Sequence, residues 1–394
     1  MLKSLLSQLA KRGRPSPRSD LPGVAPHALP FGRDAVEIAD APAAATVAEP
    51  MQLPLGAVEP PAALQRRFVS SRDVTLLLPT VAHRAEFLRS ALDFMSVAMK
   101  GAQIVISDHT EDADNDTVAR LASQFAQLDI VVERHPASLH FLERLTACAR
   151  LARSPYVVVH ADDDFMLPGA IDESVSFLDR HPDFVGCQGR TFFLKLRPPR
   201  SCAPKIHGAT ARAEGDAVSR IASQCTQFTP TLYAVTRRNA FIEANDATLR
   251  HTKNVVFWQY LSSCQLLTLG KSHVLDSLYY LRLDNPDGWR ATLIREGDRS
   301  HWPHLVVAKE FSKELAAFKG GLAAALGAAD SKDVARVVDD CSLSLIRRAF
   351  NPVWQHETAE LDLLARASVT GSTENLIIRY CGRLSLAALT RLHG

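Results

Sequence analysis

Three consecutive aspartates, Asp162–Asp164, follow the apolar run Tyr156–Val159. The run predicts a buried strand, and ligands of open parallel sheets bind at the carboxyl ends of the strands. Three adjacent carboxylates repel one another and therefore need compensating charge. A hard divalent cation, Mg²⁺ or Mn²⁺, would supply that charge through oxygen ligands and would neutralise a departing diphosphate. The alternative is an exposed acidic turn that caps the next helix, which Pro168 introduces.

Polar residues also follow two other predicted strands. Asp108 comes directly after Ile104–Ser107, while Pro79–Thr80 and Arg84 come after Val74–Leu78. Parallel strands end at the same edge of a sheet, so these groups could converge on one nucleotide. Simpler roles remain open for two of them. Asp108 could cap the loop before the next helix, and Arg84 could be a solvated residue at a helix start.

The spacing of apolar residues predicts the elements that would position these groups. Strands are expected at Val74–Leu78, Ile104–Ile106, Ile130–Val132 and Tyr156–Val159. Helical spacing lies between them; the first helix should end at Gly101, and the third should cover 141–151. This alternation predicts an α/β fold with a mostly parallel, mixed sheet flanked by helices.

The alternation loosens beyond residue 183. Strands are expected at Phe184–Cys187, Thr191–Leu196, Thr231–Val235, Ser272–Leu275 and Leu278–Leu281. From about residue 303 the sequence is rich in Ala and Leu and predicts only helix, with a break at Asn351-Pro352. We expect this region to contact an acceptor or to form an oligomer. Its arginines could also touch a membrane that carries a lipid-linked acceptor.

The start of the chain has a different composition. Ten of the 22 prolines lie in the first 61 residues, among alanine-rich stretches, so residues 15–68 are expected to form a disordered or loosely docked leader. Residues 2–12 could form a short amphipathic basic helix on an anionic membrane surface or a partner, or a helical start without a role. The chain would then consist of a leader (1–70), an α/β domain (71–300) and a helical region (301–394).

The overall composition excludes several classes of protein. The 394 residues are 46% apolar and 22% charged, which is typical of a soluble globular protein, and the net charge of +2 disfavours a dedicated nucleic-acid binder. No apolar run reaches the roughly 18 residues of a membrane-spanning helix. The seven cysteines include no Cys-x-x-Cys pair. Neither a disulfide framework nor a thiolate zinc site is therefore expected, and a reducing cytoplasm is the expected location.

Four motifs, in this order over about residues 72–290, resemble family 2-like glycosyltransferases of the GT-A fold. They are Leu76-Leu77-Leu78-Pro79-Thr80, Arg84-Ala85-Glu86-Phe87-Leu88, Ile104-Val105-Ile106-Ser107-Asp108, and Ser154-Pro155-Tyr156-Val157-Val158 leading into Ala161-Asp162-Asp163-Asp164-Phe165. The resemblance implies transfer of one sugar, with inversion, from a nucleotide-sugar donor. A UDP-sugar is the first expectation for the donor, and the acceptor would be a polysaccharide, a glycolipid or a protein. Mn²⁺ or Mg²⁺ would be the cofactor.

The resemblance also implies roles for individual residues. Pro79, Thr80 and Asp108 would hold the base and ribose, with Arg84 nearby. Asp162 and Asp163 would contact ribose and metal, and Asp164 would be the principal metal ligand. Arg282 would contact the donor diphosphate, because a guanidinium fork matches phosphate geometry; a surface salt bridge is the alternative.

One position departs from the family pattern. Inverting members place a carboxylate near the start of the helix before Gly270-Lys271, as the base that takes the proton of the acceptor hydroxyl. Gln259 stands at that position and cannot accept a proton usefully. Asp246, His251 and Glu243 are the nearby substitutes, and the sequence does not choose among them.

Three other functions compete with this interpretation. A catalytically impaired scaffold that binds nucleotide sugars on the same fold would explain Gln259. A phosphatase-type hydrolase also uses an Asp at a strand end. That class has Thr or Val at the position of Met166 and places its Asp after the first strand of the series, whereas the strand here is the fourth. A nucleotidyltransferase would need a Gly-rich loop after the first strand, where Thr80–Arg84 contains no glycine.

Overall fold

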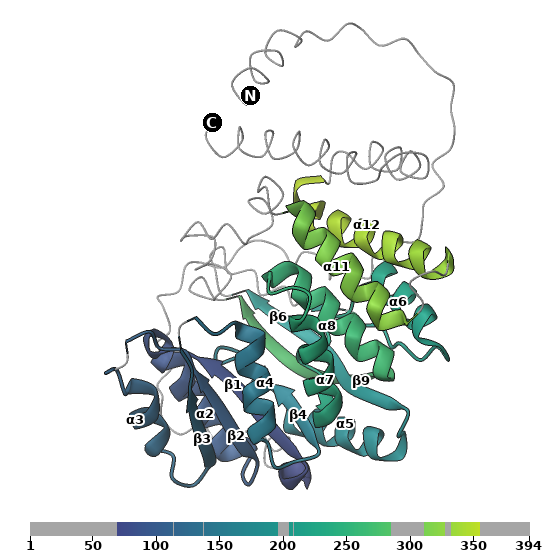
Figure 1. Cartoon of the computed structure of the whole chain (residues 1–394). Coiled ribbons are helices and arrows are strands. Elements are labelled where there is room, and N and C mark those ends of the chain that lie inside the picture. The colour runs from purple at the N-terminus through teal and green to yellow at the C-terminus, as the bar shows by residue number, and fades with distance from the viewer. Residues whose placement is uncertain are drawn as a thin grey trace, which may run out of the picture. The chain divides into compact units, whose positions relative to one another are not determined.

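The computed structural model describes residues 69–112, 114–136, 138–195, 205–207, 209–284, 311–327 and 332–354 (Figure 1). All of them belong to one compact unit of the chain, Ala41–Gly394. The expected leader, apart from its last two residues, and the expected helix over 2–12 lie outside the described residues. The division into 1–70, 71–300 and 301–394 therefore stays a prediction.

A nine-stranded sheet forms the centre of the described fold. Its strands are β1 (Val74–Thr80), β2 (Gln103–Asp108), β3 (Asp129–Arg134), β4 (Tyr156–Val159), β5 (Phe165–Met166), β6 (Phe184–Lys195), β7 (Lys205–His207), β8 (Val235–Arg237) and β9 (Lys271–Asp284). They are arranged in the order β3-β2-β1-β4-β8-β6-β9-β5, with β7 paired to β6. The first four strands of this order are parallel, and β8 is antiparallel to both of its neighbours.

Helices cover both faces of this sheet (Figure 1). The helices of the described residues are α2 (Ala85–Ala98), α3 (Thr117–Ser123), α4 (Phe141–Leu151), α5 (Pro168–Arg180), α6 (Ala217–Thr226), α7 (Arg238–Leu249), α8 (Val255–Leu269), α11 (Phe311–Leu326) and α12 (Lys332–Trp354), with a 3-10 turn, η2, at Ala82–Arg84. The predicted α/β class, a mostly parallel mixed sheet flanked by helices, is confirmed.

Alternate residues of the central strands explain the two layers of helices. Leu76 and Leu78 of β1 are buried in one core with residues of α2, α3 and α5, whereas Leu77 is buried in a second core with residues of α4 and α7. Successive side chains of a strand point to opposite faces, so a strand that is apolar at every position must be covered on both. The unbroken run Leu76–Leu78 therefore requires a central strand.

Local signals fix the helix ends that border the sheet. Gly101 follows α2 with φ +90, as its predicted role at a helix end requires. His140 begins α4 with a capping box: its Nδ1 accepts the backbone N–H of Leu142 (3.3 Å), and Glu143 accepts the backbone N–H of His140 (3.0 Å). The predicted helix over 141–151 is confirmed to the residue.

The second half of the fold differs from several predictions. The two strands expected within 184–196 form the single strand β6, and the two expected within 272–281 form the single strand β9. β6 and β9 pair with each other in parallel, with three register shifts. The irregular spacing of these shifts breaks the period-2 pattern and makes each strand look divided. The strand expected at Thr231–Val235 is wrong, because β8 begins only at Val235. The helix break expected at Asn351-Pro352 is also wrong, because α12 continues to Trp354.

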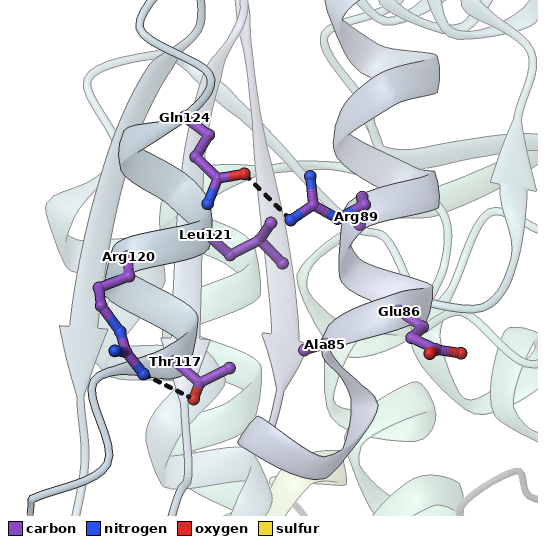
Figure 2. Close-up of a pocket in the computed structure, with 7 residues that line it drawn as sticks. All are labelled: Ala85, Glu86, Arg89, Thr117, Arg120, Leu121 and Gln124. Carbon is purple, nitrogen blue, oxygen red and sulfur yellow. Dashed lines mark hydrogen bonds between the residues drawn. The ribbon is translucent and has the colours of Figure 1, made fainter.

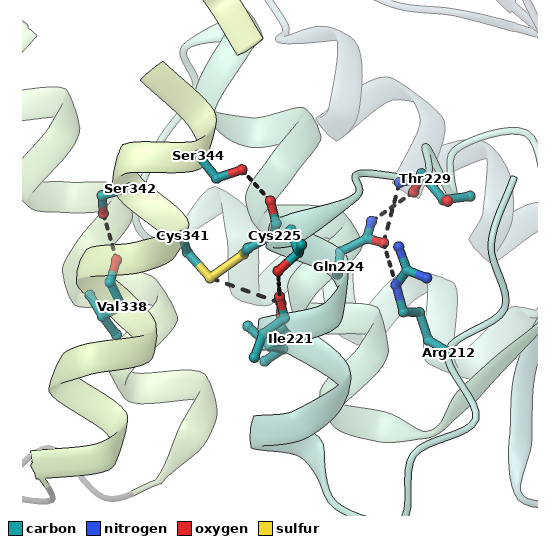
Figure 3. The surroundings of a disulfide bond; sticks show 11 residues. Arg212, Ile221, Gln224, Cys225, Thr229, Val338, Cys341, Ser342 and Ser344 are labelled. Atoms are coloured by element: carbon teal, nitrogen blue, oxygen red, sulfur yellow. Dashed lines mark hydrogen bonds between the residues drawn. A yellow bond between two sulfur atoms is a disulfide. The ribbon is translucent and has the colours of Figure 1, made fainter. Parts of the chain in front are cut away.

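The helices α11 and α12 pack against α6 and α8. Leu261 of α8, Phe318 of α11 and Val337 of α12 belong to one buried cluster that is separate from the sheet cores. A disulfide joins Cys225 of α6 to Cys341 of α12 inside this cluster, 116 residues apart in sequence (Figure 3). This bond corrects the expectation, drawn from cysteine spacing, that disulfides are absent. The two cysteines meet only because two helices that are distant in sequence pack together, so no local sequence motif predicts the pair.

Three further described cysteines, Cys148, Cys187 and Cys264, are buried thiols. No helix among the described residues is long and apolar enough to cross a membrane.

Candidate active site

The carboxyl ends of β1, β2 and β4 bring the predicted residues to one edge of the sheet. Thr80 and Asp108 are register partners at the ends of β1 and β2, and Pro79 pairs with Ser107 one step earlier. Leu77 of β1 pairs with Val159, so the chain leaves β4 beside Thr80 and continues into the aspartates.

Arg84 holds the first two aspartates. Its Nη2 lies 2.6 Å from Oδ1 of Asp162, and its Nε donates to Oδ2 of the same carboxylate at 2.9 Å. Nη2 also lies 2.8 Å from Oδ2 of Asp163. Thr80 donates its hydroxyl to Oδ2 of Asp162 at 2.8 Å. Both oxygens of Asp162 are therefore engaged inside the protein.

Burial makes these contacts strong. The side chains of Arg84, Asp162 and Asp163 are 11%, 5% and 14% exposed. Burial favours the neutral form of Arg84, but the hydrogen bond and charge of Asp162, followed by those of Asp163, raise the pKa of the guanidinium above its usual value. Burial raises the pKa of Asp162 despite the opposing effect of Arg84. The pair is thus an internal ion pair with little access to water.

The third aspartate has a different partner. Tyr280 of β9 donates its hydroxyl to Oδ2 of Asp164 at 2.5 Å, and both residues are buried. The ring of Tyr233 stacks on that of Tyr280, with centroids 4.9 Å apart. β9 reaches the aspartates because Met166 of β5, two residues after Asp164, pairs with Tyr280.

Arg282 lies two residues beyond Tyr280 on the same strand. Burial favours its neutral form, but the nearby hydroxyls of Tyr233 and Tyr280, followed by the charges of Asp164 and Asp163, raise the pKa of its guanidinium. Arg282 is therefore an electrostatic neighbour of the aspartates, and its contact with a donor diphosphate stays a prediction. The charge of a second cation, besides Arg84, thus acts on the aspartates.

Basic side chains surround Asp108. Its Oδ1 accepts the backbone N–H and hydroxyl of Thr110, and its Oδ2 lies 3.7 Å from Nε of Arg134. Arg144 of α4, 7% exposed, is a further cation close enough to interact with Asp108. Burial lowers its pKa to about 10. Among the described residues, Nε of Arg144 and Nδ1 of His109 have no hydrogen-bond partner although both atoms are buried.

The aspartates do not fit a divalent cation as they stand. No group of three His, Cys, Asp or Glu side chains in the described part of the chain is arranged to hold a metal ion. Asp162 could become a ligand only by giving up Arg84 or Thr80, and one oxygen each of Asp163 and Asp164 is already engaged. The compensating charge that the sequence assigned to a metal comes here from Arg84. The roles of Asp162 and Asp164 as metal ligands stay predictions.

The candidates for the catalytic base have different surroundings. Asp246 on α7 forms an exposed ion pair with Arg150 of α4 (2.7 Å). His251 lies against α11, where a Cβ added to Gly321 would meet its ring at 2.9 Å. Gln259 is exposed in the first part of α8, beside the buried Trp258 that stacks on Phe141 of α4. None of the three contacts the aspartates through an interaction found among the described residues.

Sequence reasoning missed Arg144, Tyr233 and Tyr280. Arg144 sits among the apolar positions of α4, and a charged residue there normally snorkels to solvent, so its burial has no sequence signal. Tyr280 lies in the alternating segment around Arg282, where it was assigned no role. Its distance of 116 residues from Asp164 hides the contact.

A groove of about 420 Å³ lies between α2 and α3, outside the cluster of aspartates (Figure 2). Arg89 of α2 donates to Oε1 of Gln124 of α3 across it at 3.0 Å. Ala85, the residue after Arg84, also lines it. None of the predicted site residues lines this groove.

No protein-family model matches the chain, and no curated protein matches it. Among solved structures it is similar to TarS 1–349 of S. aureus, at 13% identity and a TM-score of 0.47, over 80% of this chain and 88% of that one. It is also similar to the same protein in complex with UDP-GlcNAc (12% identity, 71% and 92% covered, TM-score 0.38). A third similar structure is the mannosyltransferase PcManGT of Pyrobaculum calidifontis with GDP-Man and Mn²⁺ (16% identity, 84% and 92% covered, TM-score 0.39). Similarity at these TM-scores carries no argument about function.

Proposed function

We propose that the chain is a glycosyltransferase that moves a sugar from a nucleoside-diphosphate sugar, with a UDP-sugar as the first candidate, to a glycan, glycolipid or protein acceptor. The observation that carries the proposal is the convergence of Thr80, Arg84, Asp108 and Asp162–Asp164 from three parallel strand ends. This edge is where open α/β sheets bind nucleotides.

The groups around Asp108 suit the nucleoside. Its carboxylate can accept hydroxyl or N–H donors of the nucleoside, and Thr80 lies beside it on the adjacent strand. Arg144 and His109 carry buried nitrogen atoms that lack partners among the described residues, and a base carbonyl or a ribose oxygen would satisfy a donor there.

The groups around Asp164 suit the diphosphate and the sugar. In the proposed single displacement, an acceptor hydroxyl attacks the anomeric carbon while the bond from that carbon to the diphosphate oxygen breaks. The electron pair of that bond leaves with the nucleoside diphosphate, and the hydroxyl proton passes to a base. Arg282 would stabilise the charge that develops on the diphosphate. Asp164, held by Tyr280, would orient the sugar hydroxyls.

The base remains one of the predicted set: Asp246, His251 or Gln259, with Glu243 beside them. Gln259, which stands where a carboxylate base is expected, favours a second candidate function, a scaffold that binds the nucleotide sugar without turning it over. The hydrolase alternative loses support, because Asp162, its nucleophile, has both oxygens held by Arg84 and Thr80. Peripheral membrane contact and an oligomer remain parts of the proposal. A cytoplasmic location also remains in it, although the disulfide between Cys225 and Cys341 is typical of oxidising compartments.

The test is a panel of nucleotide sugars incubated with the purified full chain, with release of UDP, GDP or CMP as the readout. We expect one donor to be turned over and Asp164→Asn to lower the rate by about 100-fold or more. Repeating the assay in EDTA and after adding Mn²⁺ or Mg²⁺ tests the metal requirement. Binding of a donor without release by the unaltered chain would favour the scaffold, and full activity of Asp164→Asn would overturn the proposed site.

A further inference from the structure

We propose that Arg84 is the built-in counter-ion of the aspartates and that it prevents Asp162 and Asp163 from binding a divalent cation in the free protein. The site would then be assembled by a side chain of the protein before any metal or donor arrives. This inference deepens the proposed function, on which its relevance rests, but its test needs no sugar donor.

The oxygen atoms of the two carboxylates carry the first part of the argument. Oδ1 of Asp162 accepts from Nη2 and Nε of Arg84, and Oδ2 accepts from Nε and from the hydroxyl of Thr80. Oδ2 of Asp163 is shared with the same guanidinium at 2.8 Å. A metal ion bound to Asp162 would have to displace one of these donors, within a pair that water hardly reaches.

The position of Arg84 carries the second part. Arg84 ends η2, the turn that follows β1, and its backbone N–H donates to the carbonyl of Val81 at 2.9 Å. Its guanidinium also lies over the ring of Phe87, 4.8 Å from the centroid. The turn after β1 therefore holds the guanidinium of Arg84 against the aspartates that follow β4, so Arg84 is a fixed part of the site.

The balance of charge gives the third part. The three aspartates, Arg84 and Arg282 together carry one net negative charge, and removal of Arg84 would leave two. A unit charge a few ångströms away, in surroundings of intermediate dielectric constant, changes cation affinity by at least about tenfold. The loss of Arg84 should therefore convert the aspartates from a closed ion pair into a cation site.

The experiment is a titration of the full chain with Mn²⁺, followed by electron paramagnetic resonance of the free ion, without donor. We expect weak binding by the unaltered protein and binding at least about tenfold tighter by Arg84→Gln. Arg89→Gln is the matched control, because Arg89 lies on α2, the helix that begins directly after Arg84, and contacts Gln124 instead of a carboxylate. Arg84→Lys keeps the charge without the fork and should bind Mn²⁺ with intermediate affinity.

Two results would overturn the inference. One is tight Mn²⁺ binding by the unaltered chain; the other is no gain in a folded Arg84→Gln protein, judged by circular dichroism. If Arg84→Gln does not fold, Arg84→Lys decides: an affinity no higher than that of the unaltered chain refutes the inference. A gain of Mn²⁺ affinity in a chain that releases no nucleotide from any donor would support the counter-ion and contradict the transferase. Donor turnover by the unaltered chain, together with no gain of Mn²⁺ affinity in Arg84→Gln, would support the transferase and contradict the counter-ion.

Discussion

Tyr280 places its hydroxyl on the last of the three aspartates, and this contact gives the residue a role beyond filling the core. The hydrogen bond of 2.5 Å runs to a charged acceptor, and the ring is fixed by its stack on Tyr233. Burial, followed by the nearby Tyr233 and Asp164, raises the pKa of Tyr280 well above its usual value, so the hydroxyl stays a donor. In the proposed transferase, Tyr280 would therefore act by positioning Asp164.

We expect Tyr280→Phe to lower kcat for donor turnover by about 10- to 100-fold, the value of one hydrogen bond to a charged group. KM for the donor should change less, because the base and ribose contacts are elsewhere. Tyr156→Phe is the control: Tyr156 also donates to a carboxylate, Oδ1 of Asp179 at 2.6 Å, but at the start of β4. Equal kcat values for both variants would show that Tyr280 does not position Asp164.

At this scale the sequence predicted which residues share the edge of the sheet, but not which side chains contact one another. Asp108 and Asp162–Asp164 lie within a few residues of the ends of apolar runs, so the strand-end rule locates them without tertiary information. Arg84 was assigned to the same edge, but its contact with Asp162 depends on the pairing of β1 with β4. Arg144 and Tyr280 come from a helix face and a distant strand, which no local pattern connects to the aspartates.

At the scale of elements, two neighbouring glycines of α11 provide a matched pair. A Cβ at Gly321 would lie 2.8 Å from Cδ2 of Leu261 and 2.9 Å from Cγ of His251, whereas a Cβ at Gly320 would meet nothing within 4 Å. Gly321 therefore lets α11 approach α8 closely.

We expect Gly321→Ala to lower the free energy of unfolding by about 1–3 kcal/mol through overpacking. Gly320→Ala should be neutral or raise it by up to about 1 kcal/mol, because alanine is the better helix former. Urea unfolding followed by circular dichroism measures both. Equal stability of the two variants would mean that α11 does not pack on α8 in this register.

The disulfide between α6 and α12 gives a second prediction at this scale. Reduction should lower the free energy of unfolding by about 2–4 kcal/mol, because the cross-link restricts the unfolded chain. The double variant Cys225→Ser, Cys341→Ser should show the lower value with or without reductant, and Cys187→Ser, which removes a buried thiol, should still respond to reductant. Non-reducing peptide mapping checks the bond itself. Separately alkylated Cys225 and Cys341 in the untreated protein would contradict it.

The elements were predicted best where neighbours in sequence are neighbours in space. β1 to β4 alternate with helices, so their periodicity is regular and the predicted segments hold. β6 and β9 pair through residues that are 86 to 89 positions apart in the sequence, from Gly186 with Ser272 to Lys195 with Asp284, and they shift register three times. Their pattern therefore depends on partners that the local sequence does not contain. Burial of α11 and α12 against α6 and α8 is likewise set by distant contacts.

At the scale of the whole molecule, buried histidines make the fold sensitive to acid. Burial lowers the pKa of His160 to about 4, and it also lowers the pKa values of His135 and His140. An unfolded histidine takes up its proton near pH 6.5. Between these two values the unfolded chain binds more protons, so stability is complete above about pH 6.5 and is lost as the pH falls toward 4.

We expect the free energy of unfolding to fall by about 3 kcal/mol from His160 alone between pH 7 and pH 4, with further loss from the other two residues. Urea unfolding at a series of pH values measures the slope. His160→Gln cannot take up a proton and should give a shallower slope, even if it is less stable at pH 7. A slope unchanged by His160→Gln would show that other groups cause the acid sensitivity.

The bond between Cys225 and Cys341 also closes a covalent ring. The ring contains β8, α7, α8 and β9, and with them Tyr233, Tyr280 and Arg282, whereas β1, β2 and β4 with their aspartates lie outside it. One backbone cut inside the ring leaves a single covalent molecule, and one cut outside it releases a separate polypeptide. On non-reducing electrophoresis, protein cut once inside the ring would therefore run as one species, and protein cut once outside it would run as two.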